Sequence, residues 1–211
     1  LYEKENAKVF VTGSNSSLLS SEISSVLTGR NKVLELYPLS FKEYLKTRKD
    51  IAIGASTKSQ IALNKCFDDY FYLGGFPYIL KTKDVQILKD YYSNILYKDI
   101  IVRKKIRQVK DIKEISLFLM NNVGQLCSYN QIIKNSGIKS TSTIKNFIDF
   151  LSEAYLFFTV PKYDFSVRKQ IQNPKKIYFI DVGMLRQVGI CFSNNSGWLL
   201  ENLVFIELKR Q

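Results

Sequence analysis

Apolar residues recur along this chain at two different spacings, and the two spacings separate predicted helices from predicted strands. A spacing of three or four residues, which places apolar side chains on one face of a helix, dominates the sequence. It predicts helices over residues 16–27, 41–48, 59–73, 84–106, 109–122, 128–138, 140–157 and 198–210. Ser40 and Glu43 carry the capping-box pattern that begins the second of these helices.

Short runs of β-branched and aromatic residues predict the strands. They cover residues 8–12, 32–37, 156–161 and 176–180. Pro38 ends the second run, and Asp181-Val182-Gly183 ends the last one.

A short turn that contains Gly137 joins the helices predicted over 128–138 and 140–157. Two helices with such a turn between them are typical of a helix-turn-helix, and the two strands that follow would supply a wing. The pattern therefore predicts a winged helix over residues 126–190, preceded by a helical region over 51–125.

The composition is that of a globular chain with a strong positive charge. Of 211 residues, 45% are hydrophobic, and Lys and Arg together outnumber Asp and Glu by 31 to 19, which gives a formal net charge of +12. Such an excess favours a polyanionic partner such as DNA. A generally lysine-rich composition explains the same charge equally well.

Several classes of site are excluded by composition. The chain has no His, which removes His-based triads and most catalytic zinc sites. Cys66, Cys127 and Cys191 lie far apart in apolar surroundings, so we expect reduced core residues and a cytoplasmic protein. No apolar run approaches the ~18 residues of a membrane span, so no membrane partner is expected.

A phosphate-binding loop of the pattern G-x-x-x-x-G-K-[ST] is absent from the 211 residues. The nearest stretch, 54–59, lacks the second glycine and follows no clear strand. No apolar strand ends in paired acids that could hold Mg²⁺. We therefore do not expect this chain alone to hydrolyse ATP.

Ordered blocks of sequence carry a family resemblance over nearly the whole chain. They are VFVTGSNSSLLSSEISSVLTGR, VLELYPLSFKEYL, GGFPYIL, YKDIIVRKKIR, KIYFIDVGM and GWLLENLVFIEL. In this order the chain resembles a prokaryotic AAA+ ATPase family that carries a C-terminal winged-helix and nuclease-like domain of unknown function. The resemblance implies a mainly α fold with an α/β remnant of the AAA+ core at the N-terminus, a helical linker and a winged helix-turn-helix.

The same resemblance implies domain limits and a function. Residues 1–50 would be the C-terminal part of the ATPase core, 51–125 a helical lid and connector, 126–190 the winged helix, and 191–211 the first helix of a nuclease-like domain. The chain would be a fragment of an ATPase that binds and hydrolyses ATP with Mg²⁺ in its full-length parent. The alternative is a stand-alone winged-helix module that binds DNA or protein without enzymatic activity.

Three residues acquire catalytic roles by the resemblance. Ser14 and Asn15 fall at the sensor position beside the γ-phosphate, where a polar side chain orients the attacking water. Arg30 falls where an arginine reaches the nucleotide of a neighbouring subunit, which implies a homo-oligomer. In the simpler interpretation, Ser14 and Asn15 form a turn and helix cap, and Arg30 is a surface residue favoured by a helix dipole.

The predicted DNA-binding residues combine a basic run with the start of the second helix of the helix-turn-helix. Cations can follow a phosphate backbone, and hydroxyls and amides can contact phosphates and base edges. The candidates are Arg103, Lys104, Lys105, Arg107, Thr141, Lys145 and Asn146. Winged helices also bind proteins, so a protein partner is the alternative.

Charged residues near the C-terminus resemble part of a nuclease motif, but the resemblance is superficial. Glu207 and Lys209 imitate the end of a nuclease motif, but that motif needs a strand and these residues are predicted on a helix. By the resemblance, Glu201 would be the helix carboxylate of the nuclease-like fold. We expect no nuclease activity from this chain.

Overall fold

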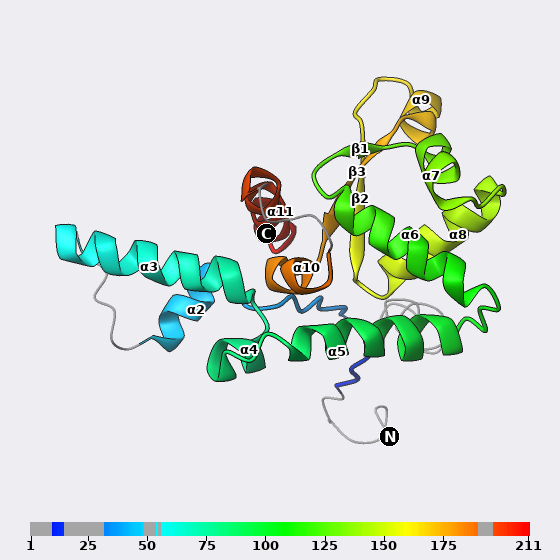
Figure 1. Ribbon diagram of the computed structural model, residues 1–211. Helices are drawn as coiled ribbons and strands as arrows, with labels where there is room; N and C mark the ends of the chain where they lie inside the picture. The colour runs from blue at the N-terminus through cyan, green and yellow to red at the C-terminus, as the bar shows by residue number, and fades with distance from the viewer. Residues whose placement is uncertain (1–9, 15–31, 49–53, 55, 190–195) are drawn as a thin grey trace, which may run out of the picture.

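The computed structural model shows a mainly helical chain with one small antiparallel sheet (Figure 1). It describes residues 10–14, 32–48, 54, 56–189 and 196–211. Core side chains from the helices that follow residue 73 and from the sheet form one large cluster, and a smaller cluster joins the first two described helices.

The first described helices form where the sequence supplies caps. Helix α2 spans Phe41–Thr47, and the predicted capping box is present, because Ser40 Oγ accepts from Glu43 N and the Glu43 carboxylate accepts from Ser40 N. Helix α3 spans Thr57–Leu73 and extends away from the main body (Figure 1). Its residue Tyr70 stacks on Tyr44 of α2, with ring centroids 5.7 Å apart.

A glycine pair ends α3, and the chain then enters the long helical stretch. Helix α4 spans Pro77–Thr82, with proline at its first position. Helix α5 (Ile87–Asn94) passes into the π-helix η2 (Ile95–Val102), and α6 spans Val109–Asn121. The helices predicted over 84–106 and 109–122 are confirmed, but the apolar spacing did not indicate the π-helical winding.

The predicted pair of helices is also present. Helix α7 spans Tyr129–Ser136, begins with a Ser128 capping box and ends at Gly137, which has a positive φ of 67°. Helix α8 spans Thr141–Glu153. Its buried face is formed by Ile144, Phe147, Ile148 and Leu151.

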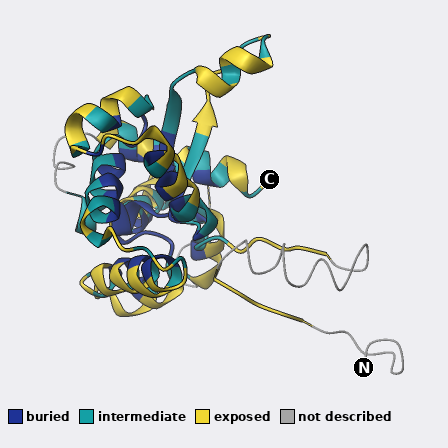
Figure 2. Cartoon of the chain, turned by 90° about the vertical axis from the view of Figure 1, so that its right-hand side faces the viewer, coloured by how far each residue is buried: buried dark blue, intermediate teal, exposed yellow. Residues whose placement is uncertain are grey.

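Three strands form the sheet. Strands β1 (Leu126–Cys127), β3 (Lys175–Phe179) and β2 (Phe157–Pro161) lie in that order, and both pairings are antiparallel. The strands predicted over 156–161 and 176–180 are confirmed to within one residue. Between β2 and β3 the chain forms a short helix, α9 (Val167–Gln172), that was not predicted and protrudes at the top of the molecule (Figure 2).

Two more helices complete the described chain. Helix α10 (Val182–Val188) follows β3 directly, and α11 spans Ser196–Lys209, which confirms the helix predicted over 198–210. Helix α10 packs against α3 and α5, so it joins the N-terminal helices to the sheet.

The strand predicted over 32–37 is wrong for this structure. These residues form no regular element, and the side chain of Leu36 is 95% exposed. A strand needs a hydrogen-bonded neighbour, and no strand of the described chain pairs with this segment. Residues 10–14 likewise form no strand. The rest of the predicted strand at 8–12 and the helix predicted over 16–27 lie outside the described residues.

Candidate functional site

A tight turn after η2 carries the basic run. Lys104 N donates to Ile100 O at 2.8 Å and Ile106 N donates to Ile101 O at 2.9 Å, which ends the helix. Lys105 then takes a positive φ of 52°, a conformation that is uncommon for a residue with a side chain. The turn leaves Lys105 and Arg107 exposed to solvent.

This turn and helix α8 together form an open hollow of about 300 Å³. Three of the predicted basic residues, Lys104, Lys105 and Arg107, line it, and so do Thr143 and Asn146 of α8. The remaining lining residues are Ile106, Gln108, Phe147 and Phe150. The fold thus brings two segments about forty positions apart in sequence into one site with cations, a hydroxyl and an amide. We call it the basic hollow.

Not every cation of the run is free to meet a ligand. Lys104 Nζ lies 2.5 Å from the carboxylate of Glu153 and 5.0 Å from the centre of the Phe150 ring. Arg103 lies 3.9 Å from Asp99, one helical turn earlier. In the described part of the chain, Lys105 and Arg107 form no ion pair, so their charges face the hollow uncompensated.

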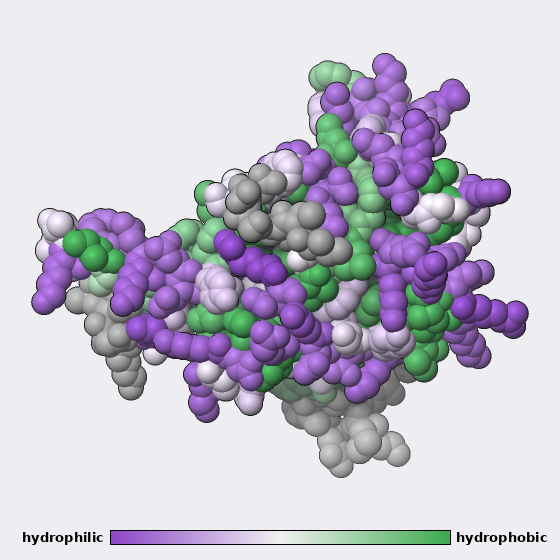
Figure 3. All heavy atoms as spheres, viewed as in Figure 1, coloured by the Kyte–Doolittle hydropathy of each residue, from purple (hydrophilic) through white to green (hydrophobic). Residues whose placement is uncertain are grey.

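The other predicted DNA contacts lie on the exposed face of α8. Thr141, Lys145 and Asn146 are exposed, and Lys145 Nζ lies 5.2 Å from the ring centre of Tyr129 on α7. Asp149 is exposed on the same helix and reduces the positive charge of this face. Hydrophilic residues are numerous on the right-hand side of the molecule, over α7, α8 and the turn after η2, although hydrophobic residues lie between them (Figure 3).

Of the three residues with predicted catalytic roles, only Ser14 lies in the described chain. Ser14 Oγ donates to Asp99 Oδ1 at 3.1 Å, so this hydroxyl contacts η2. Asn15 and Arg30 lie outside the described residues. Among the described residues, no three acidic or cysteine side chains are grouped to hold a metal ion.

Asp181, the most buried acid among the described residues, joins two of the sequence blocks. Its Oδ2 accepts from Gly75 N at 2.6 Å, and its Oδ1 accepts from Met184 N at 2.8 Å, which caps α10. Neither Gly74 nor Gly183 leaves room for a side chain. A Cβ added to Gly74 would lie 2.2 Å from the Asp181 carboxylate, and a Cβ added to Gly183 would lie 2.2 Å from Leu73 O. Burial raises the pKa of Asp181 to about 6, against the opposing effect of its backbone N–H donors.

From the sequence, Asp181 was expected only to end a strand. Its hydrogen bonds to Gly75 N and Met184 N, which we call the clasp, were not predicted. The local signal was an aspartate directly before V-G-M-L, which is a favoured helix N-cap. Its partner Gly75 lies 106 residues earlier, and no sequence pattern indicated that contact.

Asn202 of α11 pairs with β3 beyond the end of the short strand β1. Its Oδ1 accepts from Phe179 N at 2.7 Å and its Nδ2 donates to Phe179 O at 2.9 Å, so the side chain pairs as a neighbouring strand would. Next to it, Glu201 accepts from Lys176 Nζ at 2.7 Å and from Tyr178 OH at 2.8 Å. The bond from Lys176 lowers the pKa of Glu201. Glu201 is therefore a partner of β3 in this chain.

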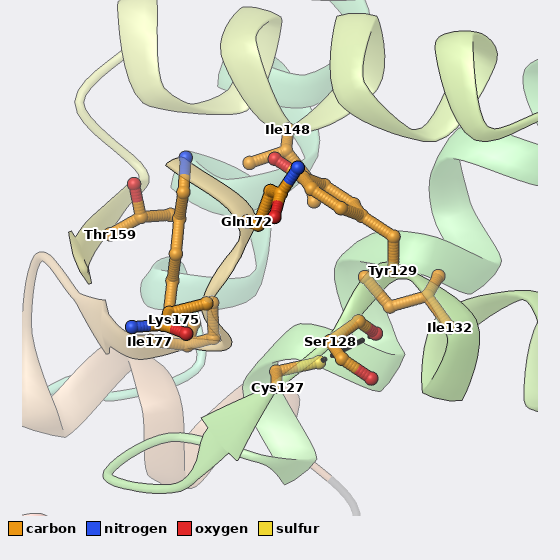
Figure 4. A pocket seen from close by; sticks show the side chains of 10 residues that line it. Cys127, Ser128, Tyr129, Ile132, Ile148, Thr159, Gln172, Lys175 and Ile177 are labelled. Atoms are coloured by element: carbon orange, nitrogen blue, oxygen red, sulfur yellow. Dashed lines mark hydrogen bonds between the residues drawn. The ribbon is translucent and has the colours of Figure 1, made fainter. Parts of the chain in front are cut away.

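A second, smaller hollow lies between the sheet and α7 and contains Cys127 (Figure 4). Its thiol lies 3.9 Å from Ser128 O, and burial raises its pKa to about 11, so it is a neutral thiol near pH 7. Cys66 is likewise a buried free cysteine, so two of the three cysteines expected in the core are confirmed there. Cys191 lies outside the described residues.

Helices of the described chain are all too short or too polar to cross a membrane. Glu207 and Lys209 both lie on α11, as predicted, and Glu207 contacts Arg210 at 3.4 Å.

Comparison with known families divides the chain into two matched regions. Residues 64–195 match the model of a family described as a domain of unknown function, DUF8612, and residues 1–45 match the model of an AAA domain. The clasp, the basic hollow and the sheet all lie within or at the border of the first region.

Curated relatives match almost the full length of this chain. The uncharacterized protein MJ1544 of Methanocaldococcus jannaschii is 38% identical over 96% of the chain, and an uncharacterized protein of Haemophilus influenzae is 31% identical over 98%. The matches cover 47% and 52% of those proteins, so the chain spans about half the length of these relatives. No solved structure matches the chain.

Proposed function

The chain belongs to the DUF8612 family, and because its first 45 residues match an AAA domain, we propose that it is part of an ATPase that contacts nucleic acid through the DUF8612 region. ATP binding and hydrolysis with Mg²⁺ belong in this proposal to the full-length protein, whose relatives are about twice as long as the chain. The two matched ranges support a division near residue 50 between the ATPase core and a helical connector.

The proposed nucleic-acid module is a winged helix. Its elements follow the order α6, β1, α7, α8, β2, β3, and the sheet order β1-β3-β2 places the last strand in the centre. Helices α7 and α8 are joined by a short turn at Gly137, as in a helix-turn-helix. In this arrangement α8 is the recognition helix, and the connection between β2 and β3 is the wing.

One observation carries the proposal: the basic hollow brings Lys105 and Arg107 beside Thr143 and Asn146 of α8. Unpaired cations hold phosphates, and hydroxyls and amides next to them donate to phosphate oxygens or base edges. The buried apolar residues of α8 fix this face, because Ile144 and Phe147 pack into the core while Asn146 points outward.

ATP has no complete site among the described residues, so we assign no step of hydrolysis to them. The chain lacks a phosphate-binding loop, Ser14 bonds to Asp99, and no acidic cluster suits Mg²⁺ in the described ranges. Ser14, Asn15 and Arg30 remain proposed contributors to a site that the rest of an AAA domain would complete.

The test is a pair of charge-matched double variants. Lys105→Ala with Arg107→Ala removes two cations from the hollow, and Lys58→Ala with Lys89→Ala removes two exposed lysines from α3 and from the far end of α5. Affinity for a blunt 20-base-pair duplex is measured by fluorescence anisotropy between 50 and 200 mM KCl.

We expect the hollow variant to lose affinity and to reduce the slope of log affinity against log salt by roughly two, since each phosphate contact contributes about 0.9. The control variant should keep most of the affinity and most of the salt slope. Equal losses in the two variants would mean that only net charge matters, and absence of duplex binding at 50 mM KCl would refute the nucleic-acid proposal.

A further inference from the structure

The connection between β2 and β3 exposes more apolar surface than its fold requires. The side chains of Tyr163, Phe165, Val167 and Ile171 are 73%, 96%, 70% and 66% exposed. Helix α9, which forms part of this connection, has no buried residue. These side chains therefore stabilise no core, and we call residues 162–171 the wing tip.

The two aromatic rings of the wing tip are held in an ordered turn. Asp164 Oδ1 accepts from Ser166 N at 2.9 Å, and Asp164 O accepts from Gln170 Nε2 at 2.6 Å. The rings of Tyr163 and Phe165 lie edge to face, with centroids 5.5 Å apart and planes 71° from each other. This geometry leaves ring faces open to solvent on a turn that is fixed at its base.

Positive charge surrounds these rings. Lys162, Arg168 and Lys169 are exposed, and no carboxylate of the described chain pairs with any of them. Asp164 is the single acid of the wing tip, so three cations outnumber it there, and its Oδ1 accepts from Ser166 N. Open aromatic faces among unpaired cations suit a ligand that combines planar rings with phosphates.

The wing tip lies at the end of the surface that leads to α8. Gln172 and Lys175, just after it, line the same small hollow as Tyr129 of α7, and Lys145 of α8 lies over the Tyr129 ring. Figure 3 shows many hydrophilic residues along this side, from α9 to the turn after η2, with hydrophobic ones between them. One extended nucleic acid could thus contact the wing tip and the basic hollow.

We propose that Tyr163 and Phe165 stack on unpaired bases at a single-stranded end of a duplex whose paired part lies against α8 and the basic hollow. The faces of paired bases are covered within a duplex, so only unpaired bases can offer a face to these rings. Lys162, Arg168 and Lys169 hold the phosphates of the unpaired strand. This inference rests on the proposed nucleic-acid function and adds the class of substrate, a duplex with an overhang.

The experiment compares three ligands and two double variants of the 211-residue chain. The ligands are a blunt 20-base-pair duplex, the same duplex with a ten-nucleotide overhang, and a 20-nucleotide single strand. Tyr163→Ala with Phe165→Ala removes the rings, and Val167→Ala with Ile171→Ala removes similar exposed apolar surface without removing a ring. All four side chains are exposed, so both variants should fold.

The expected result is that the chain prefers the overhang and that the ring variant, which lacks two stacking rings, loses about thirtyfold or more of that affinity, with blunt-duplex affinity unchanged. The Val167/Ile171 variant should bind like the parent chain. Equal binding of blunt and overhang ligands, or equal losses in both variants, would overturn the stacking inference. The Lys105/Arg107 variant tests the basic hollow separately. If this variant keeps both the preference for the overhang and the affinity for the blunt duplex, the role of the basic hollow is refuted and the stacking inference is not.

Anionic vesicles of phosphatidylcholine and phosphatidylserine test the remaining alternative, which is that the wing tip binds a membrane surface. Sedimentation with vesicles that depends on Tyr163 and Phe165, without any overhang preference, would show that the wing tip meets a membrane surface and would overturn the inference.

Discussion

Asp181 and Gly75 lie 106 residues apart in sequence and are joined by a 2.6 Å hydrogen bond from the Gly75 N–H to the Asp181 carboxylate. Gly75 O in turn accepts from Leu39 N at 2.7 Å, and Tyr70 OH donates to Leu39 O at 2.7 Å. Leu39 lies in the segment that matches the AAA domain, and Asp181 lies in the DUF8612 region. The glycine pair is therefore one of the points where the two regions are tied together, beside the stacking of Tyr44 on Tyr70.

Gly74→Ala should destabilise the chain strongly. Gly74 has φ 80° and ψ −170°, a conformation that is essentially restricted to glycine, and its added Cβ would lie 2.2 Å from Asp181 Oδ1. Because the backbone and the buried carboxylate would both have to move, we expect a loss of about 3 kcal/mol or more in the free energy of unfolding. Urea denaturation followed by circular dichroism measures it.

Gly137→Ala is the matched control for that change. Gly137 also has a positive φ, 67°, but a Cβ added to it would meet no atom within 4 Å. We expect a loss of about 1 kcal/mol from the backbone conformation alone. Similar losses for the two variants would show that the contact with Asp181 contributes nothing.

Asp181 should make stability depend on pH between about 4 and 6. Burial raises its pKa to about 6 in the folded chain, whereas an unfolded aspartate has a pKa near 3.9. The folded state therefore binds the extra proton, so this contribution to stability is full below pH 4 and is lost as pH rises through 6. Its size is about 3 kcal/mol.

Asp181→Asn isolates this effect from the other carboxyl groups. Glu43 and Glu201 have lowered pKa values and act in the opposite direction, but they are common to both proteins. The variant does not titrate at this position, so its stability deficit relative to the parent chain should be larger at pH 4.5 than at pH 7.5. A deficit that grows with pH would mean that the backbone donors, and not burial, dominate the pKa of Asp181.

Local signals account for the features that were predicted correctly from the sequence. Helix α2 begins at the capping box of Ser40 and Glu43, and α7 begins after Ser128 and ends at Gly137. These signals depend on residues close in sequence, and both helices form where expected. The two long strands are also within one residue of their predicted positions. For the basic hollow, the sequence identified Lys105 and Asn146 as candidates, but only the fold places them beside the same opening.

Features made by distant segments could not be predicted in this way. The run at 32–37 alternates like a strand, yet strand formation depends on a neighbour that the pattern does not specify. The Asp181–Gly75 bond, the pairing of Asn202 with β3 and the contact between Lys104 and Glu153 join residues whose proximity only the tertiary fold determines. The π-helical winding of η2 likewise has no sequence pattern of its own.

Asn202→Ala should destabilise the chain although it removes only a small polar side chain. Asn202 is fully buried, and its loss leaves the N–H and C=O of Phe179 unpaired at the edge of β3. Each buried unpaired group costs about 1–3 kcal/mol, so we expect a loss of about 3 kcal/mol. Asn135→Ala, at an exposed position of α7 where the side chain bonds only to Gln131 O, should change the free energy of unfolding by about 0.5 kcal/mol or less.

Glu153→Gln should strengthen nucleic-acid binding, which is the opposite of what most substitutions do. The Glu153 carboxylate lies 2.5 Å from Lys104 Nζ at the basic hollow, so it neutralises one of the three cations there. Glutamine keeps the size of the side chain and removes the charge, which leaves Lys104 able to hold a phosphate. We expect higher affinity for the blunt duplex and a salt slope steeper by roughly one.

Two comparisons separate this effect from a general change in charge. Glu114→Gln also removes one acid, but its partner Lys110 lies outside the hollow, so affinity should rise only slightly and the salt slope should stay the same. Combining Glu153→Gln with Lys104→Ala should abolish the gain, because the released cation is then missing. A gain that survives in the double variant would show that Glu153 repels the nucleic acid directly, and Lys104 would then have no part in binding.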